Sequence, residues 1–175
     1  VDGLWAFTLA SSSEAEVYGA NFSDKLNYDP HSLCARFGFT VAADMTSVQR
    51  CVVGLCSAHN DTLNDVVSHA WFRLDNGVNL YVESDDGTTD NDDIDTTINV
   101  TAGQLVHCRI EIGSDRTAYF FAGTGATSTP IRVASSTTFT VGTGRLQPCM
   151  ILQKDSGATR PILRVCYYGL YAKRG

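Results

Sequence analysis

The sequence predicts an all-β protein, a sandwich of two antiparallel sheets with about twelve strands. Three observations favour this fold class. Apolar and polar residues alternate along most of the 175-residue chain. Clusters of Gly, Asp, Asn and Ser separate the alternating segments, and no segment shows a convincing 3.6-residue helical period. Because the strands use the whole chain, we expect one domain over residues 1–175.

The segment 33–41, Leu-Cys-Ala-Arg-Phe-Gly-Phe-Thr-Val, shows the alternation most clearly. Its odd-numbered positions are apolar, while Arg36, Gly38 and Thr40 occupy the other face of an extended chain. A strand of this kind turns one face to a core and the other to solvent or a partner.

Two pairs of segments predict β-hairpins. The segments 70–75 and 78–84 flank Asn76-Gly77, a dipeptide typical of a type I′ turn. The segments 104–113 and 116–123 flank Ser114-Asp115. Further strands are expected at 130–135, 137–141, 146–154 and 161–173, and the best candidate for a short helix is 61–69.

The charge distribution argues against nucleic-acid and membrane partners. The net charge is −6, and no Lys or Arg lies between Arg73 and Arg109, where eight carboxylates gather. No basic footprint for a phosphate backbone occurs, and no apolar run of roughly 18 residues predicts a membrane span. The chain begins with Val, so we expect a mature product or a piece of a longer protein.

Six cysteines leave two redox states open. Cys108 lies on the apolar face of its segment and fits a small core residue. Cys51 and Cys56 would point to opposite faces of one strand and could not bridge to each other. No Cys-x-x-Cys pair indicates a zinc site. Buried free thiols are the preferred interpretation, and some disulfides are the alternative.

The stretch 83–95 packs Glu83 and six aspartates into thirteen residues. It fails the spacing of an EF-hand, which needs Gly at the sixth position and Glu at the twelfth. A calcium site of another kind is an alternative, because a cation relieves the repulsion between clustered carboxylates. The preferred interpretation is a hydrated connection between strands. The calcium candidates are Asp85, Asp86, Asp90, Asp92, Asp93 and Asp95.

The sequence gives little support to catalysis, and we expect no enzyme. Glu83 and Asp85 have the parity of a carboxylate pair for glycoside hydrolysis, but they lie where a strand gives way to a turn. No Gly-x-Ser-x-Gly elbow and no paired-histidine metal motif occurs. His107 falls on the polar face of its segment, and His59 fits a turn beside Asn60.

Aromatic residues on both faces of two segments predict a contact surface. The runs Tyr-Phe-Phe at 119–121 and Cys-Tyr-Tyr-Gly-Leu-Tyr at 166–171 place rings both toward a core and away from it. A sheet with one solvated face does not need outward rings. We expect that second face to pack on a neighbouring subunit or to form a ligand groove.

Several segments together resemble a known family. They are 4–15, 32–41, 57–60, the strand, hairpin and acidic turn of 71–95, Thr-Thr-Phe at 137–139, and 144–154. Over nearly the whole chain the pattern is similar to concanavalin A-like, lectin-like jelly-roll domains of tailed-phage virion proteins. The resemblance implies a two-sheet jelly-roll sandwich and brings no catalytic residues.

The resemblance implies a non-enzymatic structural protein of a bacteriophage, namely a capsid decoration, head-fibre or tail module. We expect it on the virion surface after assembly in the host cytoplasm. Its partners would be other virion proteins, such as the major capsid protein, and further copies of itself in a homo-oligomer. The alternative is a carbohydrate-binding lectin-like module for host-surface glycans, with Asn60, Trp71 and Arg73 as ligand-binding candidates. A degraded glycosidase that uses Glu83 and Asp85 is the third hypothesis.

Overall fold

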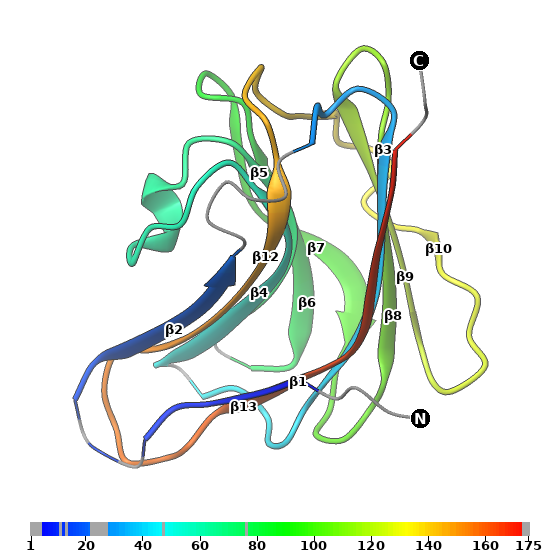
Figure 1. Cartoon of the computed structure of the whole chain (residues 1–175). Coiled ribbons are helices and arrows are strands. Elements are labelled where there is room, and N and C mark those ends of the chain that lie inside the picture. Colours follow the sequence, from blue (N-terminus) through cyan, green and yellow to red (C-terminus); the bar gives the residue numbers. More distant parts are fainter. Residues whose placement is uncertain are drawn as a thin grey trace.

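A computed structural model describes residues 5–10, 12, 14–21, 28–46, 48–75 and 77–172, which form a sandwich of two antiparallel sheets (Figure 1). The predicted fold class is therefore confirmed. Thirteen strands are present in this described part of the chain, where the sequence predicts about twelve.

Sheet A is the seven-stranded sheet. Its order is β1 (Trp5–Thr8), β13 (Ile162–Ala172), β3 (Leu33–Val41), β8 (Val106–Ile112), β9 (Thr117–Thr124) and β10 (Ile131–Arg132), and β11 (Phe139–Thr140) also pairs with β9.

Sheet B is the six-stranded sheet. Its order is β2 (Glu16–Asn21), β12 (Gln147–Lys154), β4 (Gln49–Cys56), β5 (His69–Asp75), β6 (Asn79–Asp85) and β7 (Asp90–Asn99). The strands β2 and β7 are its edges, and the strands bend toward the segment 57–68, which lies outside this sheet (Figure 1).

Both predicted hairpins are confirmed, β5 with β6 and β8 with β9. Gly77 has a φ of +140°, a conformation that a side chain rarely adopts, while Asn76 lies outside the described residues. The expected parity of β3 is also confirmed, because its apolar positions are buried in the core between the sheets.

The main core lies between the two sheets and is strongly aromatic. Phe72 of sheet B meets Phe37 and Phe120 of sheet A edge to face, with ring centroids 5.9 and 5.4 Å apart. Tyr168 stacks on Phe37 from β13 at 5.2 Å. Such ring pairs add to the stabilisation from apolar burial, so the inward rings of β9 and β13 are core residues.

The helix expected over 61–69 is wrong except for a single turn. Only Leu63–Asp65 forms a 3₁₀ helix, and His69 begins strand β5. Leu63 and Val66 pack against sheet B from outside, so tertiary contacts hold this segment close to the sheet. No helix in the described part of the chain is long and apolar enough to cross a membrane.

All six cysteines are free thiols, and four of them are buried as in the preferred interpretation, while Cys34 and Cys166 are partly exposed. Cys108 is buried in the main core, as predicted. Cys51 points into that core and Cys56 points to the other side of sheet B, which confirms their opposite directions.

Candidate binding site

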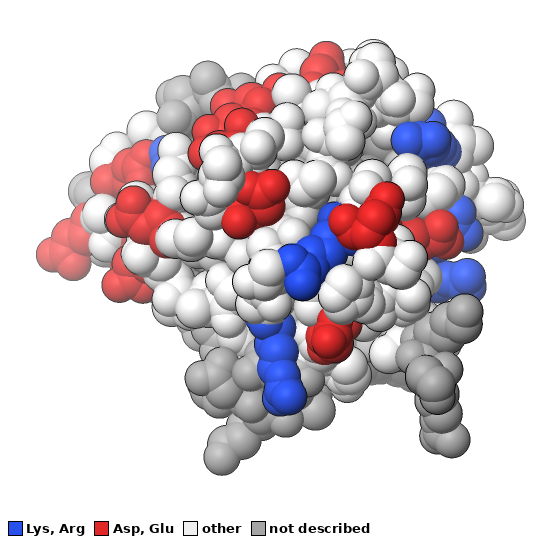
Figure 2. Space-filling view, turned by 90° about the horizontal axis from the view of Figure 1, so that it is seen from above, with Lys and Arg blue, Asp and Glu red and all other residues white. Residues whose placement is uncertain are grey.

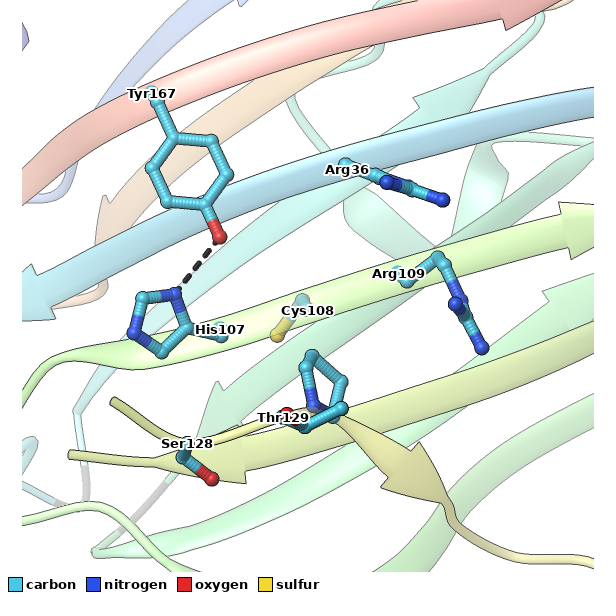
Figure 3. Close-up of a pocket in the computed structure, with 8 residues that line it drawn as sticks. Arg36, His107, Cys108, Arg109, Ser128, Thr129 and Tyr167 are labelled. Atoms are coloured by element: carbon cyan, nitrogen blue, oxygen red, sulfur yellow. Dashed lines mark hydrogen bonds between the residues drawn. The ribbon is translucent and has the colours of Figure 1, made fainter. Parts of the chain in front are cut away.

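The outer face of sheet A, turned away from the core, carries an open cleft of about 400 Å³. Strands β13, β3 and β8 supply its floor and one side, and the segment before β10 supplies the other side (Figure 3). The residues that line it are Arg36, His107, Cys108, Arg109, Ser128, Thr129, Pro130 and Tyr167.

Tyr167 is positioned by a glycine on the neighbouring strand. Tyr167, Gly38 and His107 lie in one row across β13, β3 and β8. Because Gly38 has no side chain, the Tyr167 ring lies across its backbone, in space that a Cβ on Gly38 would occupy. The Tyr167 hydroxyl thereby reaches Nδ1 of His107, 2.8 Å away (Figure 3).

The phenol of Tyr167 remains protonated at neutral pH. Burial raises its pKa above the usual range, and the neighbouring thiols of Cys108 and Cys166 act in the same direction. Its ring is nevertheless 43% exposed. Tyr167 therefore offers a ligand an aromatic surface and a protonated hydroxyl group, and it is poorly suited to act as a general base.

A second glycine, Gly123, leaves room for the segment that forms the opposite wall of the cleft. Gly123 of β9 continues the row beyond His107, and a side chain there would overlap the hydroxyl of Ser128. The segment that contains Ser128 can therefore fold closely over the sheet, where Thr129 and Pro130 complete the wall. Absent side chains at two positions thus make this hollow on an otherwise regular sheet.

The next row along the same face carries the charge. Arg36 of β3 and Arg109 of β8 are directly opposite one another. The Arg109 guanidinium lies 3.9 Å from the centre of the Phe121 ring, and its Nε is 3.1 Å from a carboxylate oxygen of Glu111. Arg36 lies 5.5 Å from the centre of the Tyr171 ring. Arginine side chains stacked in this way keep their N–H groups available for an anion or a hydroxyl group.

The predicted ligand residues lie on the outer face of sheet B, and the structure does not present them to a ligand. Trp71 is 1% exposed. It lies under Leu63 and Val66 in an outer apolar cluster with Val52 and Cys56. A sugar cannot stack on a ring that the chain itself covers, so Trp71 is a structural residue here.

Arg73 and Asn60 are engaged within the chain as well. Arg73 donates to a carboxylate oxygen of Glu83 at 2.8 Å and forms a second ion pair with Asp75. The side chain of Asn60 accepts a hydrogen bond from the backbone N–H of Thr62 at 2.9 Å, which closes a turn. The three predicted ligand residues therefore do not form a common site.

Glu83 is a buried carboxyl group with a strongly raised pKa. It is 1% exposed, and Trp71 Nε1–H donates to it at 2.6 Å. Arg73 and the backbone N–H of Asp93 are further donors. Burial raises its pKa to about 7, although Arg73 and Trp71 favour the ionised form. Asp85 points to the same side of β6, but the buried Glu83 faces protein donors rather than an open cleft.

The acidic stretch 83–95 is not a loop, so that interpretation is corrected. Glu83 and Asp85 end β6, a turn follows, and residues 90–99 form β7, an edge strand of sheet B. Asp93 and Thr97 have positive φ values of 50° and 66°, and the register with β6 shifts in two places. Bulges and charges on an edge strand prevent it from pairing with another chain, which explains an acidic strand at this position.

The calcium candidates lie along this edge, where Asp85 is directly opposite Asp90, and several have partners within the chain. Asp86 accepts hydrogen bonds from Thr88 and Thr89 N–H and from the Thr140 hydroxyl, at 2.8, 2.7 and 2.6 Å. These bonds lower its pKa. Asp85 and Asp95 accept from the N–H groups of Gly87 and Thr97. Within the described ranges no group of three or more His, Cys, Asp or Glu residues could hold a metal ion.

A smaller hollow of about 300 Å³ lies beside this turn, with Asp86, Asp115 and Arg116 among its residues. Both aspartates bind the backbone N–H groups of their own turns. Figure 2 looks onto this end of the sandwich, where acidic side chains gather on one side and basic side chains lie next to acidic ones over the rest of the view. The carboxylates here serve the turns, so the cleft on sheet A is the better candidate site.

Comparison with known proteins identifies the fold. No model of a protein family and no curated protein sequence matches the chain. Among solved structures, the carbohydrate recognition domain of Emp47p matches with a TM-score of 0.65 and 8% identity, over 99% of this chain and 90% of that one. The legume lectin-like domain from Entamoeba histolytica matches with a TM-score of 0.60 and 9% identity, over 99% and 88% of the chains.

Enzymes share this architecture. The family 7 alginate lyase A1-II′ matches with a TM-score of 0.60 and 11% identity, over 98% of this chain and 80% of that one. The protein therefore has a concanavalin A-like jelly-roll fold, the class that includes these lectin domains and lyases. At such low identity the matches show the fold alone, and none of the three links the chain to a phage particle.

The cleft residues were not selected by the sequence analysis as a site. Its expectation of outward rings on 119–121 and 166–171 does identify the correct face, since Tyr167 and Tyr171 point away from the core. The sequence does not show the register in which the strands pair, and this register brings the cleft residues together. Tyr167 and His107 are 60 positions apart, and only the pairing of β13, β3 and β8 makes them neighbours.

Proposed function

We propose that this protein is a non-catalytic, lectin-like module that binds a glycan in the cleft on sheet A. One observation carries the proposal: the half-exposed ring of Tyr167 stands beside a cleft lined by hydrogen-bonding side chains. An aromatic ring packs on the apolar face of a sugar, and a few placed polar groups fix its hydroxyls. The volume of about 400 Å³ lies within the range of small-ligand sites.

Binding without turnover fits the chemistry of the lining. Glycoside hydrolysis needs two carboxyl groups across the scissile bond, and none of the residues that line the cleft is acidic. Tyr167 keeps its proton, because burial raises its pKa. Glu83 has the raised pKa of a general acid, but it is buried against Trp71 and Arg73 on the other sheet.

The fold supports the same proposal at a general level. Two of the matching structures are named for carbohydrate recognition or for lectins. The alginate lyase has the same architecture, so the fold alone does not distinguish binding from cleavage. The distinction made here, which is from hydrolysis, rests on the absence of acidic residues in the cleft.

A glycan array probed with the whole chain, followed by calorimetric titration of the sugars retained, tests the proposal. We expect saturable binding that Tyr167→Ala weakens at least tenfold, because the stacking surface is lost. Tyr18→Ala is the matched control, since Tyr18 is also half exposed but lies on β2 of the other sheet. Absence of saturable binding to any glycan, or equal effects of the two variants, would contradict the proposal.

A second candidate function is docking to other proteins, as in a virion module or a homo-oligomer. Large exposed apolar residues favour it: Trp5, Ile131 and Tyr171, between 50 and 69% exposed, all lie on strands of sheet A. A stable interface needs roughly 1,200 Å² of buried surface with such residues near its centre. Light scattering of the purified chain, and co-purification with capsid or tail proteins from a phage lysate, test this candidate.

A further inference from the structure

We infer that the ligand of the sheet-A cleft is an acidic oligosaccharide, whose carboxylate or sulfate group is held between Arg36 and Arg109 beside the ring of Tyr167. This inference rests on the proposed function and specifies its ligand class. It starts from a pair of charges that the fold itself does not neutralise.

Arg36 and Arg109 face each other across neighbouring strands, and only one of the two arginines has a carboxylate partner among the residues that the structure describes. Like charges directly opposite on a sheet repel one another. Glu111 pairs with Arg109 at 3.1 Å, whereas Arg36 has no carboxylate partner among the residues that the structure describes. An anionic ligand at this point would supply the missing counter-charge.

Aromatic rings accompany both arginines, closely for Arg109 and at a greater distance for Arg36. Phe121 lies under Arg109 and Tyr171 beside Arg36. A third arginine, Arg132 of β10, pairs with Phe121 across the strands and lies 4.9 Å from the centre of the Tyr119 ring. A planar guanidinium that stacks on a ring can direct its N–H groups at both oxygens of a carboxylate or sulfate group.

The charge of this face is opposite to that of the whole chain. The chain carries a net charge of −6, and many of its carboxylates are in the stretch that ends β6 and forms β7 at the edge of sheet B. Arg36, Arg109 and Arg132 lie in one row on sheet A. In the contacts described above, Glu111 is the single carboxylate that pairs with this row. A local excess of positive charge on this face allows an acidic protein to attract an acidic ligand there.

A second hollow next to Tyr167 belongs to the core side of sheet A, because Trp5 lies opposite the buried Val165. Trp5, Val165 and Tyr168 border this hollow of about 170 Å³, which Tyr167 also lines. Trp5 is 50% exposed. This hollow does not continue the cleft, so the inference places the acidic group in the cleft on the outer face, at the arginine pair.

The test compares an acidic oligosaccharide with its uncharged ester and with two other polyanions. Tri-galacturonate, its full methyl ester, a sulfated oligosaccharide of similar length and single-stranded DNA are titrated into the whole chain and into Arg36→Gln, Arg109→Gln and Arg145→Gln. Arg145 is the control because it is exposed in the connection between β11 and β12. We expect tri-galacturonate or the sulfated sugar to bind at least tenfold more tightly than the ester. Arg36→Gln should remove that preference, and Arg145→Gln should leave it unchanged.

Each outcome has one reading. Tighter binding of the sulfated sugar assigns the anion to sulfate, and tighter binding of the uronate assigns it to carboxylate; both support the inference. Equal binding of the acid and its ester overturns the inference and leaves glycan binding intact. DNA bound as tightly as either acidic sugar overturns it in favour of unspecific polyanion binding. If no sugar on the array or in the titrations binds, the proposed function fails together with it.

Discussion

Arg36 and Arg109 lie directly opposite one another on β3 and β8, on the outer face of a sheet that could have placed opposite charges there. Like charges in this relationship cost a sheet up to about 1 kcal/mol of stability. A protein that keeps such a pair beside an open cleft gains from it in some way other than folding. The arginine pair therefore lowers the stability of the fold, and its expected benefit is the binding of a ligand.

Arg36→Gln is expected to leave the free energy of unfolding unchanged or raise it by about 0.5 kcal/mol, because the repulsion disappears and only a distant ring contact is lost. Arg109→Gln is expected to lower it by about 1 kcal/mol, because Arg109 stacks closely on Phe121 and pairs with Glu111. Urea unfolding of both variants measures the difference. Equal destabilisation by the two would mean that both arginines are structural.

Gly38→Ala is expected to disrupt the site and spare the fold. The added Cβ would overlap the Tyr167 ring, which is partly exposed and can swing outward. The hydrogen bond to His107 would be lost, with a cost of about 1–2 kcal/mol. Glycan binding should fall at least tenfold, and the imidazole resonances of His107 should shift in NMR spectra. Gly144→Ala is the control, since nothing lies near its missing Cβ; binding retained in Gly38→Ala would remove Tyr167 from the site.

The sandwich could be predicted from the sequence because its cause is local. Alternating side chains of period two build strands with one buried face, and the turn dipeptides fix two hairpins. That some rings of the segment 166–171 point outward was predictable, since adjacent residues of a strand face opposite sides. Which rings do so is set by a bulge between Val165 and Tyr167, which reverses the alternation. Parity does not show which residue of the neighbouring strand each ring contacts. The sequence therefore predicted an outward aromatic face but not the residues that form the cleft on it.

The candidate site depended on two features that sequence reasoning could not supply. The register of β13, β3 and β8 joins residues far apart in the chain. The effect of a missing side chain, at Gly38 and Gly123, appears only when the neighbours are known. The acidic stretch was misread because Asp, depleted in strands, was weighed without the option of a bulged and charged sheet edge. The cover over Trp71 was equally unpredictable, because local patterns do not show that Leu63 and Val66 pack on this ring.

Leu63→Ala is expected to loosen the cover over Trp71. Leu63 is buried in the outer apolar cluster, and its truncation should cost about 2–3 kcal/mol. Water should then reach the Trp71 ring and shift its fluorescence to the red, a change that Trp5, already exposed, does not obscure. Val67→Ala is the matched control in the same segment, because Val67 is largely exposed. An unchanged emission spectrum in Leu63→Ala would show that the segment does not shield the ring.

Glu83 is expected to make the stability of the protein depend on pH near neutrality. Its pKa rises from 4.5 to about 7 in the folded chain, because burial disfavours the carboxylate. Between these values the folded chain binds the proton more tightly than the unfolded chain. The contribution of Glu83 is therefore greatest below pH 4.5, falls as the pH rises and levels off above about 7, with a total change of at most about 3 kcal/mol.

Glu83→Gln isolates this effect, because the amide does not titrate while its oxygen can still accept the Trp71 N–H. The free energy of unfolding is measured in urea from pH 5 to pH 8 for both chains. The difference, wild type minus variant, should decrease across that range. Glu111→Gln is the control, since Glu111 is a partly exposed carboxylate on the other sheet, and its difference curve should be flatter. Parallel curves for wild type and Glu83→Gln would mean that Arg73 and Trp71 hold the carboxylate ionised throughout, and that the burial of Glu83 leaves its pKa near the ordinary value.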